Sequence, residues 1–165
     1  MTETMPEGWS DFFAANAGVA GALAGLIIVA ISVNVQTILQ IPGMSSRAGA
    51  TIASLILIVV CTAASLIPDQ GPRFLGAEIL LFTAFVLAIA VEAAVVMIRA
   101  ATPPYIASTW LKSIIGIVQV VPFGVAGIVL LSGSYTGLYW MAAGVLLVFA
   151  GSVANAWVLL IEILR

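Results

Sequence analysis

The stretch AANAGVAGALAGLIIVAISVNV, residues 14–35, contains no charged side chain along its 22 residues. A helix needs about 20 mainly apolar residues to cross the hydrocarbon core of a bilayer. Stretches of comparable length and composition follow at residues 48–66, 75–98, 106–131 and 138–164. The sequence therefore predicts five membrane-spanning helices.

The overall composition agrees with a membrane protein, since 63% of the 165 residues are hydrophobic and 7% are charged. The connections between the predicted spans are too short to form a soluble domain. We expect an all-α, integral membrane helical bundle that forms a single transmembrane domain over residues 14–165. Residues 1–13 carry Trp9, Phe12 and Phe13, which favour the headgroup level, so this segment is predicted to lie at the membrane interface.

Several classes of function are not supported by the residue types present. The chain has no histidine, and its single cysteine, Cys61, has no disulfide partner. Its five lysines and arginines are scattered along the chain, so nucleic acid is not an expected partner. We expect no metal, no cofactor and no catalytic residues, and we interpret the protein as a non-enzyme.

The basic residues predict an orientation, because lysine and arginine near helix ends stay on the cytoplasmic side. With five spans, one side of the membrane holds or borders four cations, which are Arg47, Arg99, Lys112 and Arg165. The other side has Arg73 as its single cation, beside the carboxylates Glu3, Glu7, Asp11 and Asp69. The N-terminus is therefore predicted outside and the C-terminus in the cytoplasm.

The first span has a face of small residues. Ala17, Gly21 and Gly25 recur at intervals of four, a spacing that lets helix backbones approach closely in a bilayer. This face either packs against another helix of the same chain or forms a contact between subunits. With the second interpretation, the protein is a homo-oligomer.

A different stripe of the same helix has a polar residue at each end. Asn16 and Asn34 lie 18 residues apart, which is five helical turns, with Leu23 and Ile27 between them. A ring of such stripes resembles an apolar gate in a pore. A buried helix with two interhelical hydrogen bonds would show the same pattern.

Three polar residues are expected at similar depth in the membrane, because the first, third and fifth spans run in the same direction. They are Asn34, Glu92 and Asn155. A carboxylate inside a membrane needs a polar partner, a water-filled cavity or a bound proton. We predict a polar cluster that holds three helices together, and an ion or proton site is the alternative.

The fourth span contains Pro122, which cannot donate a backbone hydrogen bond to the carbonyl of Val118. A kink is therefore predicted at this position.

Parts of the chain resemble a bacterial family of multi-spanning membrane proteins that is sometimes labelled as modulators of the FtsH membrane protease. The similar stretches are WSDFFAANAGVAGALAGLIIVAISVN (9–34), IPGMSSRA (41–48), LIPDQG (66–71), GLYWMAAG (137–144) and NAWVLLIEILR (155–165). The resemblance implies a multi-pass protein of the bacterial inner membrane and hints that another membrane protein is a partner. It implies no catalytic residues.

Two functions follow from these observations. The first is a non-enzymatic, oligomeric regulatory or scaffold subunit that contacts other helices among the membrane lipids. The alternative is a homo-oligomeric ion channel lined by the first span. The first is favoured, because one carboxylate and a few amides inside the spans are too few polar groups to form a pathway for ions.

Overall fold

The computed structural model describes residues 5–101, 103 and 106–161, and side chains as far as Trp157. The regular structure of these described residues is helical throughout. The helices are α1 (Trp9–Val33), α2 (Val35–Gln40), α3 (Met44–Ser65), α4 (Pro72–Ala100), α5 (Ile106–Val118), α6 (Val121–Leu131) and α7 (Gly137–Ile161). Five helical segments are long and apolar enough to span a membrane, with α5 and α6 together making the fourth. The prediction of an all-α protein with five spans is confirmed.

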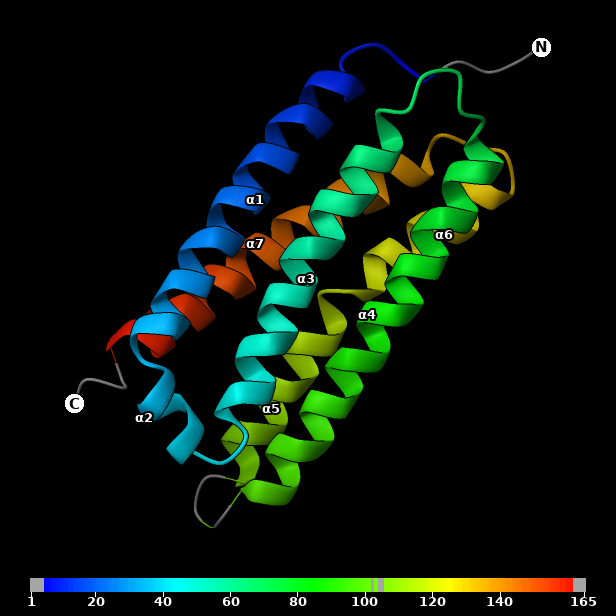
Figure 1. Ribbon diagram of the computed structural model, residues 1–165. Helices are drawn as coiled ribbons and strands as arrows, with labels where there is room; N and C mark the ends of the chain where they lie inside the picture. The colour runs from blue at the N-terminus through cyan, green and yellow to red at the C-terminus, as the bar shows by residue number, and fades with distance from the viewer. Residues whose placement is uncertain (1–4, 102, 104–105, 162–165) are drawn as a thin grey trace.

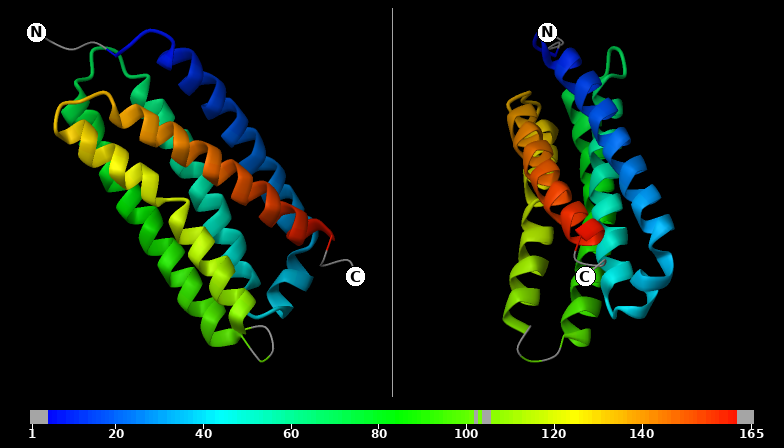
Figure 2. Two further views of the ribbon diagram at one scale, coloured as in Figure 1. Left: turned by 180° about the vertical axis from the view of Figure 1, so that it is seen from behind. Right: turned by 90° about the vertical axis from the view of Figure 1, so that its left-hand side faces the viewer.

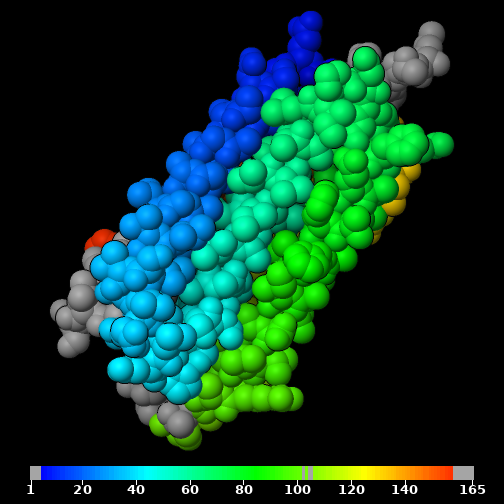
Figure 3. All heavy atoms as spheres, viewed as in Figure 1, coloured from blue at the N-terminus to red at the C-terminus, as the bar shows by residue number. Residues whose placement is uncertain are grey.

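The helices run alternately up and down in two layers (Figure 1). One layer consists of α1, α3 and α4 side by side (Figure 3), and α7 and the α5–α6 segment lie behind it (Figure 2). α3 is central because it packs against α1, α4 and α7. In α3, 56% of the most apolar window is buried, compared with 17% in α1. α1 is therefore a peripheral helix.

α1 is held at its edge by α3 and, to a smaller extent, by α7. At the beginning of α1, the ring of Trp9 meets the ring of Tyr139 in α7 edge to face, with 5.0 Å between centroids. Phe13 is fully buried beside them. The aromatic residues expected at the interface thus join the first span to the last one.

The two ends of the bundle differ in their connections. We call the end with α2 the α2 end; the termination of α4, the start of α5 and the end of α7 also lie there (Figure 1). The start of α1, the turn 66–71 and the turn 132–136 lie at the opposite end.

Several helices begin earlier than hydropathy predicts. α1 starts at Trp9 and α3 at Met44, each directly after a glycine with positive φ, +85° at Gly8 and +79° at Gly43. These left-handed residues turn the chain into the helix without the strain that a side chain would add. The first span ends at Val33, before the predicted 35, because the chain bends at Asn34 and continues as α2.

The fourth span is interrupted near Pro122. α5 ends at Val118 and α6 begins at Val121, so Pro122 occupies the first turn of the new helix. A proline is tolerated there, because its missing N–H would have no partner inside the helix. The interruption separates α5, which packs mainly on α4, from α6, which packs on both α4 and α7.

The contact between α4 and α6 is made by backbones at two glycines. A Cβ atom at Gly76 would lie 2.6 Å from the nitrogen of Leu131 and 2.7 Å from the carbonyl oxygen of Gly127. Both distances are too short for any real Cβ. Glycine is therefore required at position 76, and this contact fixes α6 against α4.

Candidate functional site

A polar face runs along the part of α3 that begins at the α2 end. Arg47, Thr51 and Ser54 are spaced by four and three residues, which places them on one side of the helix. Thr51 is 3% exposed and Ser54 is 1% exposed, so this side points into the bundle. Buried polar groups in a membrane protein need hydrogen-bond partners, either in the backbone of their own helix or on neighbouring helices.

Arg47 and Asn155 provide the closest of these partnerships, between α3 and α7. The Nε and Nη2 atoms of Arg47 donate hydrogen bonds of 3.2 and 2.6 Å to Oδ1 of Asn155. The Nδ2 atom of Asn155 donates to Oγ1 of Thr51 at 3.1 Å, and that hydroxyl donates to the carbonyl of Arg47 at 3.0 Å. These hydrogen bonds link the three side chains and hold the guanidinium of Arg47 against α7.

A second polar contact lies deeper, at the interruption of the fourth span. Gln119 is 6% exposed, and its Nε2 donates to Oγ of Ser54 at 3.4 Å. Its Oε1 lies against the backbone of Gly151 in α7, where a Cβ atom would overlap with it. The site therefore continues from the α2 end to the middle of the fourth span.

Two adjoining cavities accompany these side chains. The outer cavity, of about 150 Å³, lies between the start of α3, the end of α4 and the start of α5. The inner cavity, of about 40 Å³, lies between α3, α4, α5 and α7. Arg47, Met97 and Lys112 line both. Among the residues that line them in the described part of the chain, two are basic and none is acidic.

Buried hydroxyl groups without hydrogen-bond partners lie in this region. Ser113 of α5 is 3% exposed and lines the inner cavity, yet its Oγ bonds to no described atom. Ser152 of α7, next to Gly151, is 2% exposed and has the same property. A buried hydroxyl without a partner costs free energy, so the oxygen of Ser113 marks a place where a polar ligand or water would be stabilising.

The structure separates the three residues of the predicted polar cluster. Asn155 bonds to Arg47 and Thr51, whereas Nδ2 of Asn34 donates to the carbonyl of Ala30 in its own helix at 3.0 Å. Glu92 is exposed on the outer side of α4. Ala90 and Ala94 are buried, and Glu92 lies two residues from each, about 200° around the helix. No hydrogen bond between described atoms joins the three.

The predicted pore stripe of α1 faces the rest of its own chain. Ile27 is 3% exposed and Leu23 packs against the core. Asn16 donates from Nδ2 to the carbonyl of Phe12 at 2.7 Å, which is a bond within the helix. Both asparagines at the ends of the stripe therefore bond to their own helix backbone and make no interhelical hydrogen bond in the described part.

The small-residue face of α1, in contrast, is open. Gly21 and Gly25 are exposed, and a Cβ atom added at either position would have no heavy atom within 4 Å beyond its own helix. Ala17 at the edge of the face is partly exposed. Gly21 and Gly25 therefore pack against no other helix in the described part of the chain.

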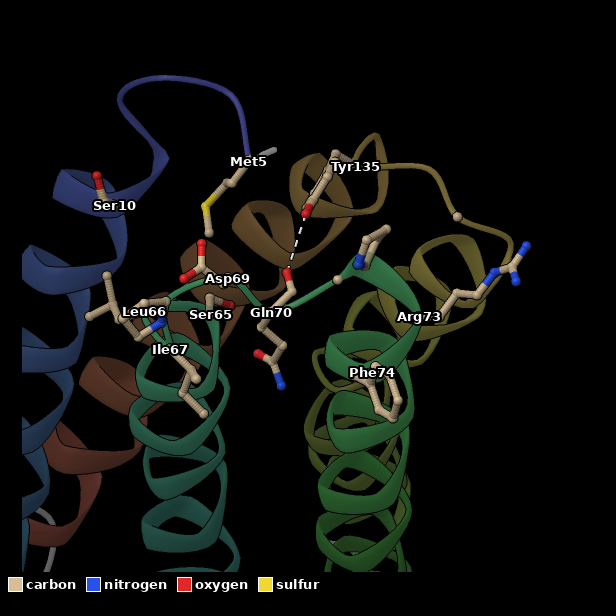
Figure 4. A pocket seen from close by; sticks show the side chains of 14 residues that line it. Met5, Ser10, Ser65, Leu66, Ile67, Asp69, Gln70, Arg73, Phe74 and Tyr135 are labelled. Carbon is tan, nitrogen blue, oxygen red and sulfur yellow. Dashed lines mark hydrogen bonds between the residues drawn. The ribbon is translucent and has the colours of Figure 1, made fainter. Parts of the chain in front are cut away.

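A further hollow of about 750 Å³ lies at the opposite end of the bundle (Figure 4). The turn 66–71 forms much of its wall, where the hydroxyl of Tyr135 donates to the carbonyl of Gln70 at 3.4 Å and Nε2 of Gln70 donates to Glu78 at 2.8 Å. Arg73 points away from Asp69 in this view. These bonds fasten the turn to α4 and to the segment before α7. Among the described residues, the hollow brings together no pair of groups suited to acid–base chemistry.

Sequence reasoning singled out Asn155 but missed most of its surroundings. Arg47 and Lys112 served there only as markers of orientation, and Thr51, Ser54 and Ser113 were not singled out. A usable signal was present in the spacing of Arg47, Thr51 and Ser54, because polar residues at intervals of four and three inside an apolar span indicate its inward face.

No family model, curated protein or solved structure matches the chain.

Proposed function

We propose that this multi-pass membrane protein is a non-enzymatic regulatory or scaffold subunit that acts through helix contacts within the bilayer, and that α1 joins it to a second copy of itself. The observation that carries the proposal is the open small-residue face of α1. Glycine inside a helix costs about 0.5–1 kcal/mol relative to alanine. Contact with lipid tails does not offset this loss of helix stability, whereas close packing of another helix against the glycines does.

A second copy fits this face better than a charged partner. The exposed surface of α1 between residues 14 and 33 carries no charged side chain, so two copies related by a twofold axis would meet without repulsion. The peripheral position of α1 leaves room for the contact (Figure 3). A heterologous membrane protein, as the family resemblance hints, would bind through the same kind of surface.

The channel lined by the first span receives less support. A pore between copies would need Leu23 and Ile27 at the surface that the copies share, and these residues pack inside a single chain. The orientation of α1 therefore favours the scaffold.

Replacing both Gly21 and Gly25 by leucine is expected to separate the copies. The leucine side chains would hold the two α1 helices apart, and we expect the dissociation constant to rise on the order of tenfold or more. Native mass spectrometry and light scattering of the detergent-solubilised chain over a concentration series measure the change.

The matched control is Gly49→Leu in α3, a glycine that is also exposed and has no atom within 4 Å of an added Cβ. This variant should associate like the wild type. A monomeric wild-type chain, or a double variant that associates as strongly as the wild type, contradicts the proposal.

We further propose that the α2 end lies in the cytoplasm of a bacterial cell, with the N-terminus outside. Three of the basic residues in the described part, Arg47, Arg99 and Lys112, are at the α2 end, and Arg73 is at the opposite end. In multi-spanning membrane proteins, the short loops with an excess of lysine and arginine lie on the cytoplasmic side.

Single cysteine substitutions are expected to report this orientation. Thr136 is exposed in the turn before α7, and Gln40 is exposed at the end of α2. A membrane-impermeant maleimide should label Thr136→Cys in intact spheroplasts and Gln40→Cys only after permeabilisation. The native Cys61 is fully buried and should stay unlabelled in both, which makes the wild type the control. Labelling in the reverse order would overturn the orientation.

A further inference from the structure

We propose that the outer side of α4 binds a transmembrane helix of another protein, one that carries a lysine or arginine at the depth of Glu92. We call this surface the Glu92 face; it consists of the exposed residues Leu81, Ala84, Phe85, Ala88 and Glu92. The inference rests on the proposed role as a scaffold within the bilayer, but it does not need the self-association through α1. α4 forms the edge of its layer opposite to α1, so the two surfaces are separate (Figure 3).

The first argument is that Glu92 is a carboxyl group without a polar partner. It is exposed, and it makes no hydrogen bond or ion pair with any described residue. Arg99 lies on the same side of α4 but about 10 Å further along the helix axis, and makes no ion pair with it. Water would solvate such a carboxylate, whereas lipid tails offer it neither a donor nor a counter-charge.

The second argument is depth. α4 has 29 residues and is about 43 Å long, compared with about 30 Å for the hydrocarbon core of a bilayer. Glu92 lies six residues, or about 9 Å, beyond the middle residue Val86, which is within the hydrocarbon when the helix is centred. Side chains tilt toward the N-terminus of their helix, and α4 begins at the end of the bundle opposite to α2. The carboxyl group is therefore directed away from the nearer headgroups, which hinders its escape to the interface.

The third argument is the shape of the surface beside the carboxyl group. Ala88 and Ala84 are exposed one and two turns before Glu92, on the side toward which its side chain tilts. Small residues at intervals of four let the backbone of another helix approach closely. Leu81 and Phe85, each 68% exposed, add apolar surface beside them. A helix that packs there can bring a cation to the carboxyl group and shield both charged groups from lipid.

Charge complementarity favours a different protein over a second copy at this face. Two copies related by a twofold axis along the membrane normal would place Glu92 beside Glu92 and Arg99 beside Arg99. Like charges repel, and the repulsion is strong where water is absent. A partner helix with one basic side chain at the depth of Glu92 meets the carboxylate without this repulsion.

The test uses the full-length chain in phosphatidylcholine vesicles, with synthetic transmembrane helices as probes. The lysine probe is a helix of leucine and alanine with one lysine about six residues from its centre, which matches the depth of Glu92. Two further probes are identical except for leucine or glutamate at that position. A donor dye is attached at Gln40→Cys, because Gln40 is exposed and the native Cys61 is buried, and energy transfer to a labelled probe is measured as lipid dilutes both. We expect the lysine probe to bind about tenfold more tightly than the leucine probe.

The variants change exposed positions, so the fold should stay intact. Glu92→Gln should raise the dissociation constant of the lysine probe about tenfold, since the amide keeps the shape and removes the charge. Glu92→Lys should reverse the preference, so that the glutamate probe binds and the lysine probe does not. Ala88→Leu should weaken binding by holding the probe away from the carboxyl group. Its matched control is Ala22→Leu, at an exposed alanine of α1, which should bind the lysine probe like the wild type.

Tighter binding of the lysine probe than of the leucine probe, with a preference that Glu92→Lys reverses, supports the proposal. Equal binding of these two probes to the wild type overturns it, as does unchanged binding of the lysine probe to Glu92→Gln. The variant with both Gly21→Leu and Gly25→Leu should bind the lysine probe like the wild type, so a failure of self-association through α1 is distinguished from a failure of this site. Loss of probe binding in that variant would place the contact on α1 and overturn the proposal.

Discussion

Gly76→Ala is expected to lower the free energy of unfolding by about 2–3 kcal/mol, at the upper end of what one added methyl group costs in a packed interior. The reason is that the new Cβ would lie 2.6 Å from the nitrogen of Leu131 and 2.7 Å from the carbonyl oxygen of Gly127, both of which are backbone atoms. A side chain that meets another side chain is relieved by a rotation. Here α4 and α6 must move apart, and the core between them loses contact.

Gly49→Ala provides the control for this prediction. Gly49 is also inside a helix, is exposed, and an added Cβ meets nothing within 4 Å. Alanine should therefore be neutral there or stabilise the helix by about 0.5–1 kcal/mol. Melting temperature and SDS-induced unfolding of the purified variants measure both changes. Equal stability of the two variants would show that α4 and α6 are not in backbone contact.

Arg47→Met is expected to cost about 1.5–3 kcal/mol, the usual range for hydrogen bonds to a charged group. The substitution keeps the length of the side chain and removes both donors to Oδ1 of Asn155, which then remains in the bundle without them. Arg99→Met is the comparison, because Arg99 is exposed and a change there should stay within about 0.5 kcal/mol.

A double-mutant cycle with Asn155→Leu separates this contact from other effects of losing Arg47. If the two residues act as one unit, the double variant should be less destabilised than the sum of the single variants by about 1–3 kcal/mol. Additive effects within about 0.5 kcal/mol would mean that the network of Arg47, Thr51 and Asn155 does not couple α3 to α7.

The number and class of the helices were predictable, because a membrane helix is defined by a long apolar run. Helix ends were not. Hydropathy predicts that the second span begins at residue 48, but α3 begins one turn earlier, at Met44. Met44–Arg47 can be helical without hydrocarbon around them, so the apolar run does not reveal this turn. That difference of one turn brought Arg47 into the helix and turned it toward α7. The separate helix α2 also lies outside the apolar run that predicted the first span, except for its first residue, Val35.

Which face of each span points into the bundle was harder to predict from the sequence. In a soluble protein a polar face marks the surface, but here both faces are apolar and lipid replaces water. Near Glu92 the buried positions of α4 are small, at Ala90, Ala93 and Ala94, whereas the exposed ones include Val91 and Val95. Glu92 was expected inside because a carboxylate is costly in lipid, whereas the packing of the alanines decides the rotation of the helix and places it outside.

The edge-to-face contact between Trp9 and Tyr139 has a consequence for biosynthesis. The first span leaves the ribosome early, and its aromatic partner in the last span follows only after most of the chain has been made. At the usual rate of translation that delay is on the order of ten seconds. During this time α1 is already in the bilayer with its glycine face exposed, but its contacts with α7 have not yet formed. When several ribosomes on one messenger insert copies side by side, the first spans of neighbouring nascent chains are therefore available to each other before either bundle has closed.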